Sequence, residues 1–142
     1  MSGPKPLNGF PSPTLNDLNA PFWSAGQADR LVLPFCVTTG RAFWPPSPIS
    51  PFVTSGPVEW GEAKPSGIIR SVIVYRRIFH ADFKPLAPYG VGLIELDAGP
   101  RLMAYVPAPD EPMAPRAGDR GRIEFITLPA GQIAIPALFR MS

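Results

Sequence analysis

The stretch PYGVGLIELDAGPRLMAYV (residues 88–106) decides the fold. Its first half, YGVGLIELDAG (89–99), is apolar and β-branched, and its glycines suit a strongly bent strand. Asp97-Ala98-Gly99-Pro100 has the composition of a turn, and RLMAYVP (101–107) returns from it. The segment therefore predicts a β-hairpin.

Three further segments around this hairpin have the composition of strands. They are GIIRSVIVYRRIF (67–79), RGRIEFITL (120–128) and QIAIPALFR (132–140), with a proline-rich connection at 108–119. Five strands in about 75 residues, the first of them long, are typical of a small closed barrel of the OB type. Periodicity alone leaves another small barrel or a sandwich open.

The residues before the barrel have a different composition. Residues 1–18 are rich in Pro, Gly, Ser and Asn and predict an extended arm. Residues 19–64 predict a short helix capped by Asn19, with Phe22 and Trp23 docking it on the rest of the protein. Short strands are expected at 31–36, 41–46 and 58–63, separated by a proline-rich loop. The expected domains are thus the arm 1–18, the segment 19–64 and the barrel 65–142.

Composition narrows the function. The chain has 21 prolines among 142 residues, which excludes a long helical bundle. Charged residues make up 17%, the formal net charge is +2, and no run of Lys and Arg occurs, so nucleic-acid binding is not expected. The single cysteine cannot form an intrachain disulfide and suits a reducing compartment. With no signal-peptide pattern and no apolar stretch of membrane-spanning length, we expect a cytoplasmic protein without membrane association.

From about Ala20 to Phe139, several segments together resemble a known family. They are PFW (21–23), RLVLPFC (30–36), FWPPSPIS (43–50), VEWGEA (58–63), Gly67, the loop from Ile78 to Ala87 with His80 and Phe83, and residues 88–106. The last is the most specific, with a Pro-Tyr start, a Glu-Leu-Asp strand end and then Gly-Pro-Arg-Leu. The chain is similar to the OB-fold family, formerly a domain of unknown function, that has an N-terminal rubredoxin-like zinc ribbon and partners thiolase-like enzymes.

The resemblance implies a mainly β protein: an N-terminal helix and a degenerate zinc ribbon, followed by a five-stranded OB-fold barrel. Zinc-binding members of the family carry two Cys-x-x-Cys pairs. On this chain the four ligand positions fall at Cys36, Thr39, Ser50 and Val53, of which one is a cysteine. A structural zinc site needs four sulfur or imidazole ligands, so the resemblance implies that zinc is absent. The ribbon would then be held by aromatic packing, for which the available side chains are Phe35, Phe43, Trp44, Phe52 and Trp60.

The resemblance also implies a function. Family members act beside thiolases, acyltransferases and aldolases that use coenzyme A thioesters. We therefore expect a non-catalytic accessory subunit that packs on such an enzyme, helps form or shield its acyl-CoA site and binds no cofactor of its own. The residues expected near the partner or coenzyme A surround the loop between the first two barrel strands: Tyr75, Arg76, Arg77, Phe79, His80, Phe83 and Lys84.

Two other functions stay open at this point. OB barrels commonly bind single-stranded nucleic acid through aromatic side chains and basic grooves, which the low charge disfavours here. A stand-alone enzyme acting on CoA esters would need a nucleophile with a base. Cys36 and the only histidine, His80, are distant in sequence and lie in no catalytic motif.

The first prediction concerns metal. Because one of the four ligand positions is a cysteine, purified protein is expected to hold less than one zinc per chain. A chelator should leave its far-ultraviolet circular dichroism unchanged. Metal analysis giving one tightly bound zinc per chain would contradict the assignment of Thr39, Ser50 and Val53 to ligand positions.

Overall fold

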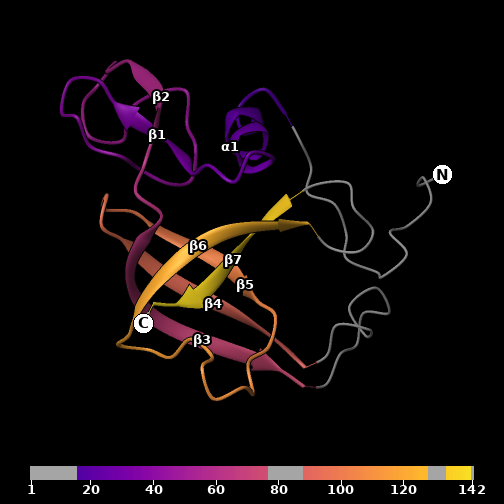
Figure 1. Ribbon diagram of the computed structural model, residues 1–142. Coiled ribbons are helices and arrows are strands. Elements are labelled where there is room, and N and C mark those ends of the chain that lie inside the picture. Colours follow the sequence, from indigo (N-terminus) through magenta and orange to yellow (C-terminus); the bar gives the residue numbers. More distant parts are fainter. Residues whose placement is uncertain (1–15, 77–87, 128–133, 142) are drawn as a thin grey trace.

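The fold was analysed in a computed structural model that describes residues 16–76, 88–127 and 134–141. In these residues it consists of one short helix, a two-stranded sheet and a closed five-stranded barrel. Figure 1 shows the helix and the two-stranded sheet lying together over one end of the barrel.

The barrel strands follow the order β3-β4-β5-β7-β6, and β6 pairs with β3 to close it. Their bounds are β3 (Ser66–Tyr75), β4 (Tyr89–Leu96), β5 (Arg101–Val106), β6 (Arg120–Thr127) and β7 (Ala134–Arg140). Every pairing is antiparallel except that of β5 with β7. The predicted hairpin is β4 and β5, joined by a turn in which Gly99 has a φ of 121°. The prediction of a five-stranded barrel of the OB type is confirmed.

Buried and partly exposed residues alternate along the strands, and the buried side chains fill the barrel. On β4 every second residue is buried, and Ile94 points inward with Ile69 of β3 and Val106 of β5. Gly92 also lies on an inward position, where the side chain of Leu138 occupies the space that a Cβ atom would need. The glycine in this strand therefore makes room for a large side chain from the opposite wall.

The N-terminal layer, as we call residues 20–63, is built from three short elements. They are α1 (Ala20–Gly26), β1 (Val32–Cys36) and β2 (Val58–Glu62), and the two strands pair antiparallel. Helix α1 follows Asn19 and has a proline in its first turn, as predicted, but the Asn19 side chain makes no capping hydrogen bond to the helix. The loop 37–57 connects the two strands.

Two predicted strands differ from the structure. Residues 41–46 form only an isolated bridge, between Phe35 and Ala42, because Pro45 and Pro46 have no N–H to donate to a ladder. The first barrel strand, predicted over 67–79, runs from Ser66 to Tyr75, and the end of the predicted range lies outside the described residues.

One hydrophobic core spans the layer and the barrel, across the boundary expected at residue 65. Buried side chains from both parts form a single cluster, with Leu31 and Leu33 on one side and Ile94 and Leu102 on the other. Phe22 of α1 is 1% exposed and lies in this cluster. This confirms the expectation that Phe22 docks the helix.

The second prediction concerns this contact. Phe22→Ala should lower the free energy of unfolding by about 3–5 kcal/mol, because it empties a fully buried aromatic site. Ile49→Ala is the control, since Ile49 is 61% exposed and should change stability by less than about 0.5 kcal/mol. Denaturant titration of both variants measures the difference. Equal stability of the two variants would show that the helix does not share the core.

Candidate functional site

The residues predicted to lie near a partner are only partly described. Tyr75 and Arg76 stand at the end of β3, whereas Arg77, Phe79, His80, Phe83 and Lys84 lie outside the described residues. Arg76 donates two hydrogen bonds to the carboxylate of Asp110, at 2.7 and 2.6 Å. This contact raises the pKa of Arg76 and lowers that of Asp110, so the charge of Arg76 is compensated within the chain.

The four positions assigned to former zinc ligands lie in β1 and the loop after it. Cys36 ends β1 and is completely buried. The Ser50 hydroxyl is also buried and accepts hydrogen bonds from the backbone N–H groups of Phe52, at 3.0 Å, and Val53, at 3.3 Å. Thr39 accepts one from the N–H of Arg41, at 3.3 Å. Each hydroxyl therefore stabilises the turn that follows it.

The structure brings three of these four side chains into contact. Hydrogen bonds from Ser50 and then from Thr39 lower the pKa of the Cys36 thiol to about 7, although burial acts in the opposite direction. Val53 is close to Ser50, because a Cβ atom built on Gly56 would lie 3.1 Å from the Cβ of Ser50 and 3.3 Å from that of Val53. The four positions thus surround one small volume.

This volume does not fit a metal ion. It offers one thiol, two hydroxyls and an aliphatic side chain, whereas zinc takes four sulfur, imidazole or carboxylate ligands. In the described part of the chain no three His, Cys, Asp or Glu side chains are grouped as a metal site would require. We find hydrogen bonds among Cys36, Thr39 and Ser50 at these positions instead.

Aromatic side chains pack around this loop, as expected, but less deeply than predicted. Phe43 is buried, while the other four of the predicted set, Phe35, Trp44, Phe52 and Trp60, are partly buried. Phe22 takes the central place instead. Its ring lies 4.6 Å from that of Trp44 and 5.4 Å from that of Phe125 of the barrel, between ring centroids.

Two adjoining cavities open between the N-terminal layer and the barrel. One, of about 400 Å³, is mostly apolar and lies between Phe22 and Trp23 of α1 and Leu93 and Met103 of the barrel. The other, of about 380 Å³, is lined by residues 41–44, Pro51, Phe52 and the turn 98–101. Trp44 and Arg101 line both cavities. We call the pair the trough. The sequence reasoning missed it, because its walls come from four separate segments.

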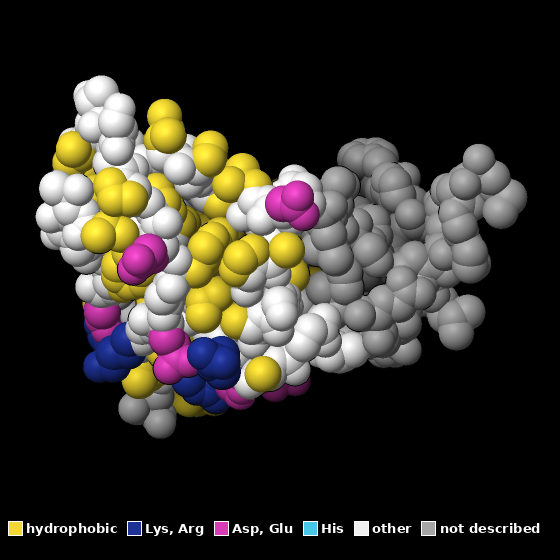
Figure 2. All heavy atoms as spheres, turned by 90° about the horizontal axis from the view of Figure 1, so that it is seen from above, with side chains coloured by type: hydrophobic (Ala, Val, Ile, Leu, Met, Phe, Trp, Pro, Cys, Tyr) yellow, Lys and Arg dark blue, Asp and Glu magenta, His cyan; other side chains and the backbone are white. Residues whose placement is uncertain are grey.

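The two ends of the trough differ in charge. In the second cavity the guanidinium of Arg41 stacks 3.9 Å above the ring centre of Phe52. Arg101 stands where the cavities meet. Figure 2, which views the molecule from the side of the N-terminal layer, shows hydrophobic side chains spread over this face and Lys and Arg side chains gathered along one edge. The trough therefore combines aromatic and apolar walls with two guanidinium groups.

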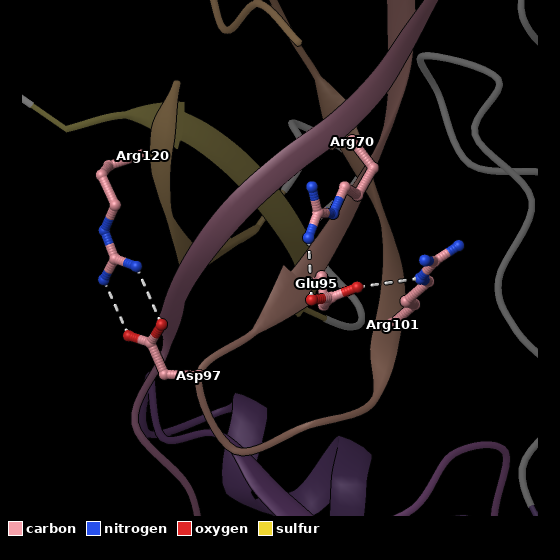
Figure 3. A network of polar contacts seen from close by, with 5 residues as sticks. All are labelled: Arg70, Glu95, Asp97, Arg101 and Arg120. Carbon is pink, nitrogen blue, oxygen red and sulfur yellow. Dashed lines mark hydrogen bonds and ion pairs between the residues drawn. The ribbon is translucent and has the colours of Figure 1, made fainter. Parts of the chain in front are cut away.

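Two networks of ion pairs surround the β4–β5 turn (Figure 3). The Glu95 carboxylate forms ion pairs with Arg70 and Arg101, with N···O distances of 2.9 and 3.2 Å. These contacts lower the pKa of Glu95. Asp97 accepts two hydrogen bonds from Arg120 and one from the Ser66 hydroxyl, and its pKa falls to about 2. The folded pKa of Asp97 is below its ordinary 3.8. Its contribution to stability is therefore complete above pH 4 and is lost as the pH falls through 2.

Comparison with known proteins agrees with the fold described above. A family model described as "ChsH2, C-terminal OB-fold domain" matches residues 60–125, which run from β2 through most of β6. Residues 60–125 are thus similar to the ChsH2 C-terminal OB-fold domain. A chain of the solved structure titled "Ltp2-ChsH2(DUF35) aldolase" is 27% identical to this chain, with a TM-score of 0.75. The similarity covers 91% of this chain and 98% of that one, so it includes the N-terminal layer as well as the ChsH2-type barrel. No curated protein matches the chain.

The described residues contain no helix with the length and apolar character needed to cross a bilayer.

The third prediction concerns Cys36. Ser50→Ala should raise the pKa of the thiol from about 7 toward its ordinary 9.0, because the hydrogen bond that lowers it most is removed. Ser47→Ala is the control, since Ser47 accepts a similar local hydrogen bond from Ile49 in the same loop. Thiolate absorbance near 240 nm, followed against pH, measures both.

The same ionisation affects stability. Because the folded pKa of Cys36 is the lower one, the contribution of the thiolate to stability is complete above pH 9 and is lost as the pH falls through 7.

The titration of the two variants also gives the contradicting outcome. Identical titration curves for Ser50→Ala and Ser47→Ala would show that Ser50 does not contact the sulfur.

Proposed function

We propose that this chain is a non-catalytic accessory subunit of a thiolase-type acyl-CoA enzyme, such as an acyltransferase, a thiolase or an aldolase. The observation that carries the proposal is the similarity to a chain of the Ltp2-ChsH2(DUF35) aldolase over nearly the whole length of both. A barrel alone would suit many functions, since one fold hosts many activities. Here the similarity extends beyond the barrel and includes the N-terminal layer.

The chemistry of the described residues supports a non-catalytic role. Cys36 is the only cysteine of the chain, and it is completely buried, out of reach of a substrate. The carboxylates Glu95, Asp97 and Asp110 are each bound to arginine, with lowered pKa values that make them poor bases. In this view the partner supplies the nucleophile and the acid–base groups.

The trough suits a coenzyme A thioester at the partner interface. Such a ligand has a flat adenine ring, negatively charged phosphates and an apolar acyl chain. Arg41 and Arg101 would attract the phosphates, the partly exposed ring of Trp44 would stack on adenine, and the apolar cavity beside α1 would receive the acyl chain. The chain would thereby help to form or shield the acyl-CoA site, without a metal or cofactor of its own.

The nucleic-acid alternative has one feature in its favour. Tyr75, Tyr89 and Tyr105 lie side by side on the barrel, with Tyr75 and Tyr89 stacked at 5.2 Å. Stacking platforms of this kind bind bases only together with cations that neutralise phosphates. The nearby Arg76 is already bound to Asp110, which weighs against this function. The stand-alone enzyme has no specific observation in its favour.

The fourth prediction tests the accessory role. The tagged chain, purified gently from its native cells, should bring down a thiolase-type polypeptide in near-stoichiometric yield, identified by mass spectrometry. That enzyme should turn over acyl-CoA substrate at least about tenfold faster with this chain than without it. The isolated chain should show no turnover. Turnover by the chain alone, or full activity of the partner without it, would contradict the proposal.

The reconstituted complex also tests the trough. Arg41→Ala should raise the KM for acyl-CoA about tenfold, the effect of losing one charged hydrogen bond to a phosphate. Arg30→Ala is the matched control, because Arg30 pairs with Glu62 and lines neither cavity. An unchanged KM in the Arg41 variant would place the coenzyme elsewhere.

A further inference from the structure

The outward-facing side chains of β3, β4 and β5 are mostly apolar or aromatic, unlike those of a typical antiparallel sheet with one solvated face. Outward positions on a solvated sheet are normally polar. On β6 they are, since Arg120, Arg122 and Glu124 point away from the core. On β4, however, the partly exposed positions that alternate with the buried ones are Tyr89, Val91, Leu93 and Glu95, three of them apolar or aromatic.

The strand register places these side chains in rows. Ser71, Leu93 and Met103 form one row, and Ile73, Val91 and Tyr105 form the next. The third row is Tyr75 beside Tyr89. We call these three rows the outer β3–β5 face.

This face is accessible, and its tyrosine rings are ordered in a row. Met103 is 64% exposed, Ile73 57% and Tyr75 41%. The three tyrosine rings lie in sequence across the strands, at centroid separations of 5.2 and 6.0 Å. Exposed aromatic and methionine side chains are enriched at protein interfaces.

Charged groups flank the rows at both ends. Beyond the Ser71 row lie Arg70, Glu95 and Arg101, where one carboxylate is shared by two guanidinium groups and one positive charge remains. Beyond the tyrosine row lies Arg76, whose charge is cancelled by Asp110. The face thus has an uncharged centre, a neutral ion pair at one end and a net positive charge at the other.

We propose that the outer β3–β5 face docks the partner subunit, through an apolar patch on that subunit that ends in a carboxylate opposite Arg70. The inference rests on the proposed function for the identity of the partner and adds the surface and its chemistry. An apolar centre with a polar, charged rim is the anatomy of a specific protein interface. Leu93 and Met103 also line the apolar cavity, so the docked partner would extend along the trough.

The charges favour a protein over a nucleic acid on this face. A strand of phosphates would need several uncompensated cations along the rows, and among the described residues the flanking ion pairs leave a single positive charge. One carboxylate on an otherwise apolar protein surface complements that charge.

The fifth prediction tests the face with a matched pair of substitutions. Met103→Glu places a charge in the middle of the rows, and Met113→Glu places the same charge on a methionine that is equally exposed, at 63%, but lies outside the face. Titration calorimetry on the reconstituted pair should give a Kd at least about thirtyfold weaker for Met103→Glu. For Met113→Glu it should be unchanged within about twofold. Ile73→Glu is a second variant, and thermal melts of each chain alone establish that it is folded.

The carboxylate on the partner is tested separately. Arg70→Gln should weaken binding about threefold and reduce the dependence of the Kd on salt, because the excess positive charge is removed. An unchanged Kd and salt dependence would overturn this part of the proposal.

The outcomes separate this inference from the proposed function. If no thiolase-type subunit binds the native chain, the proposed function fails. If it binds and Met103→Glu and Ile73→Glu bind equally well, only the docking face is overturned. The face assignment is also overturned if these substitutions dissociate a homodimer of the chain, or abolish binding to a single-stranded oligonucleotide, while the complex stays intact.

Discussion

The packing of Phe22 is the contact on which the rest of the structure depends. Helix α1 has only seven residues and would not be stable alone in water. Its one fully buried large side chain contacts Trp23 in the helix, Trp44 in the loop and Phe125 in the barrel. Because these four rings come from three parts of the chain, the layer and the barrel have a common core, and the trough between them has defined walls.

A second constraint acts in the loop 37–57. This long loop contains little regular structure, and the residues that correspond to metal ligands in the resembling family carry mostly hydroxyl and aliphatic groups here. Hydrogen bonds hold these positions in the structure: Ser50 accepts from the N–H groups of Phe52 and Val53 and contacts Cys36. Such bonds are individually weak, so the loop also relies on the packing of Phe43 and on the stacking of Arg41 over Phe52. That stacking places a guanidinium group at the mouth of the trough.

The ion pairs of four arginines explain why the outward side of β3–β5 has little net charge. Arg76 and Arg120 each face an aspartate, and Arg70 and Arg101 share Glu95. With these charges satisfied inside the chain, the outward side of β3–β5 presents tyrosine, isoleucine, valine, leucine and methionine with little net charge. A surface of this kind is costly to leave in water and gains free energy when another protein covers it.

Much of the fold could be predicted from the amino-acid sequence, because its strongest signals are local. The alternation in 89–96, the turn at Asp97–Pro100 and the β-branched run from Gly67 to Tyr75 depend on neighbouring residues, and the hairpin and the five-stranded barrel followed from them. The family resemblance likewise rested on short motifs, and it assigned Cys36, Thr39, Ser50 and Val53 to one cluster. The strand expected at 41–46 was wrong, since Pro45 and Pro46 outweigh the apolar residues beside them.

Contacts between distant segments were decided only by the tertiary structure. The trough joins α1, the loop at 41–52, the β4–β5 turn and β7, which no local pattern connects. The sharing of Glu95 by Arg70 and Arg101, and the alignment of Ile73, Val91 and Tyr105 in one row, depend on strand register. Register is set by closure of the barrel and by the bulge between Ile69 and Ser71. A shift of one residue would turn every outward side chain inward, so the composition of this face exists only once the strands are paired.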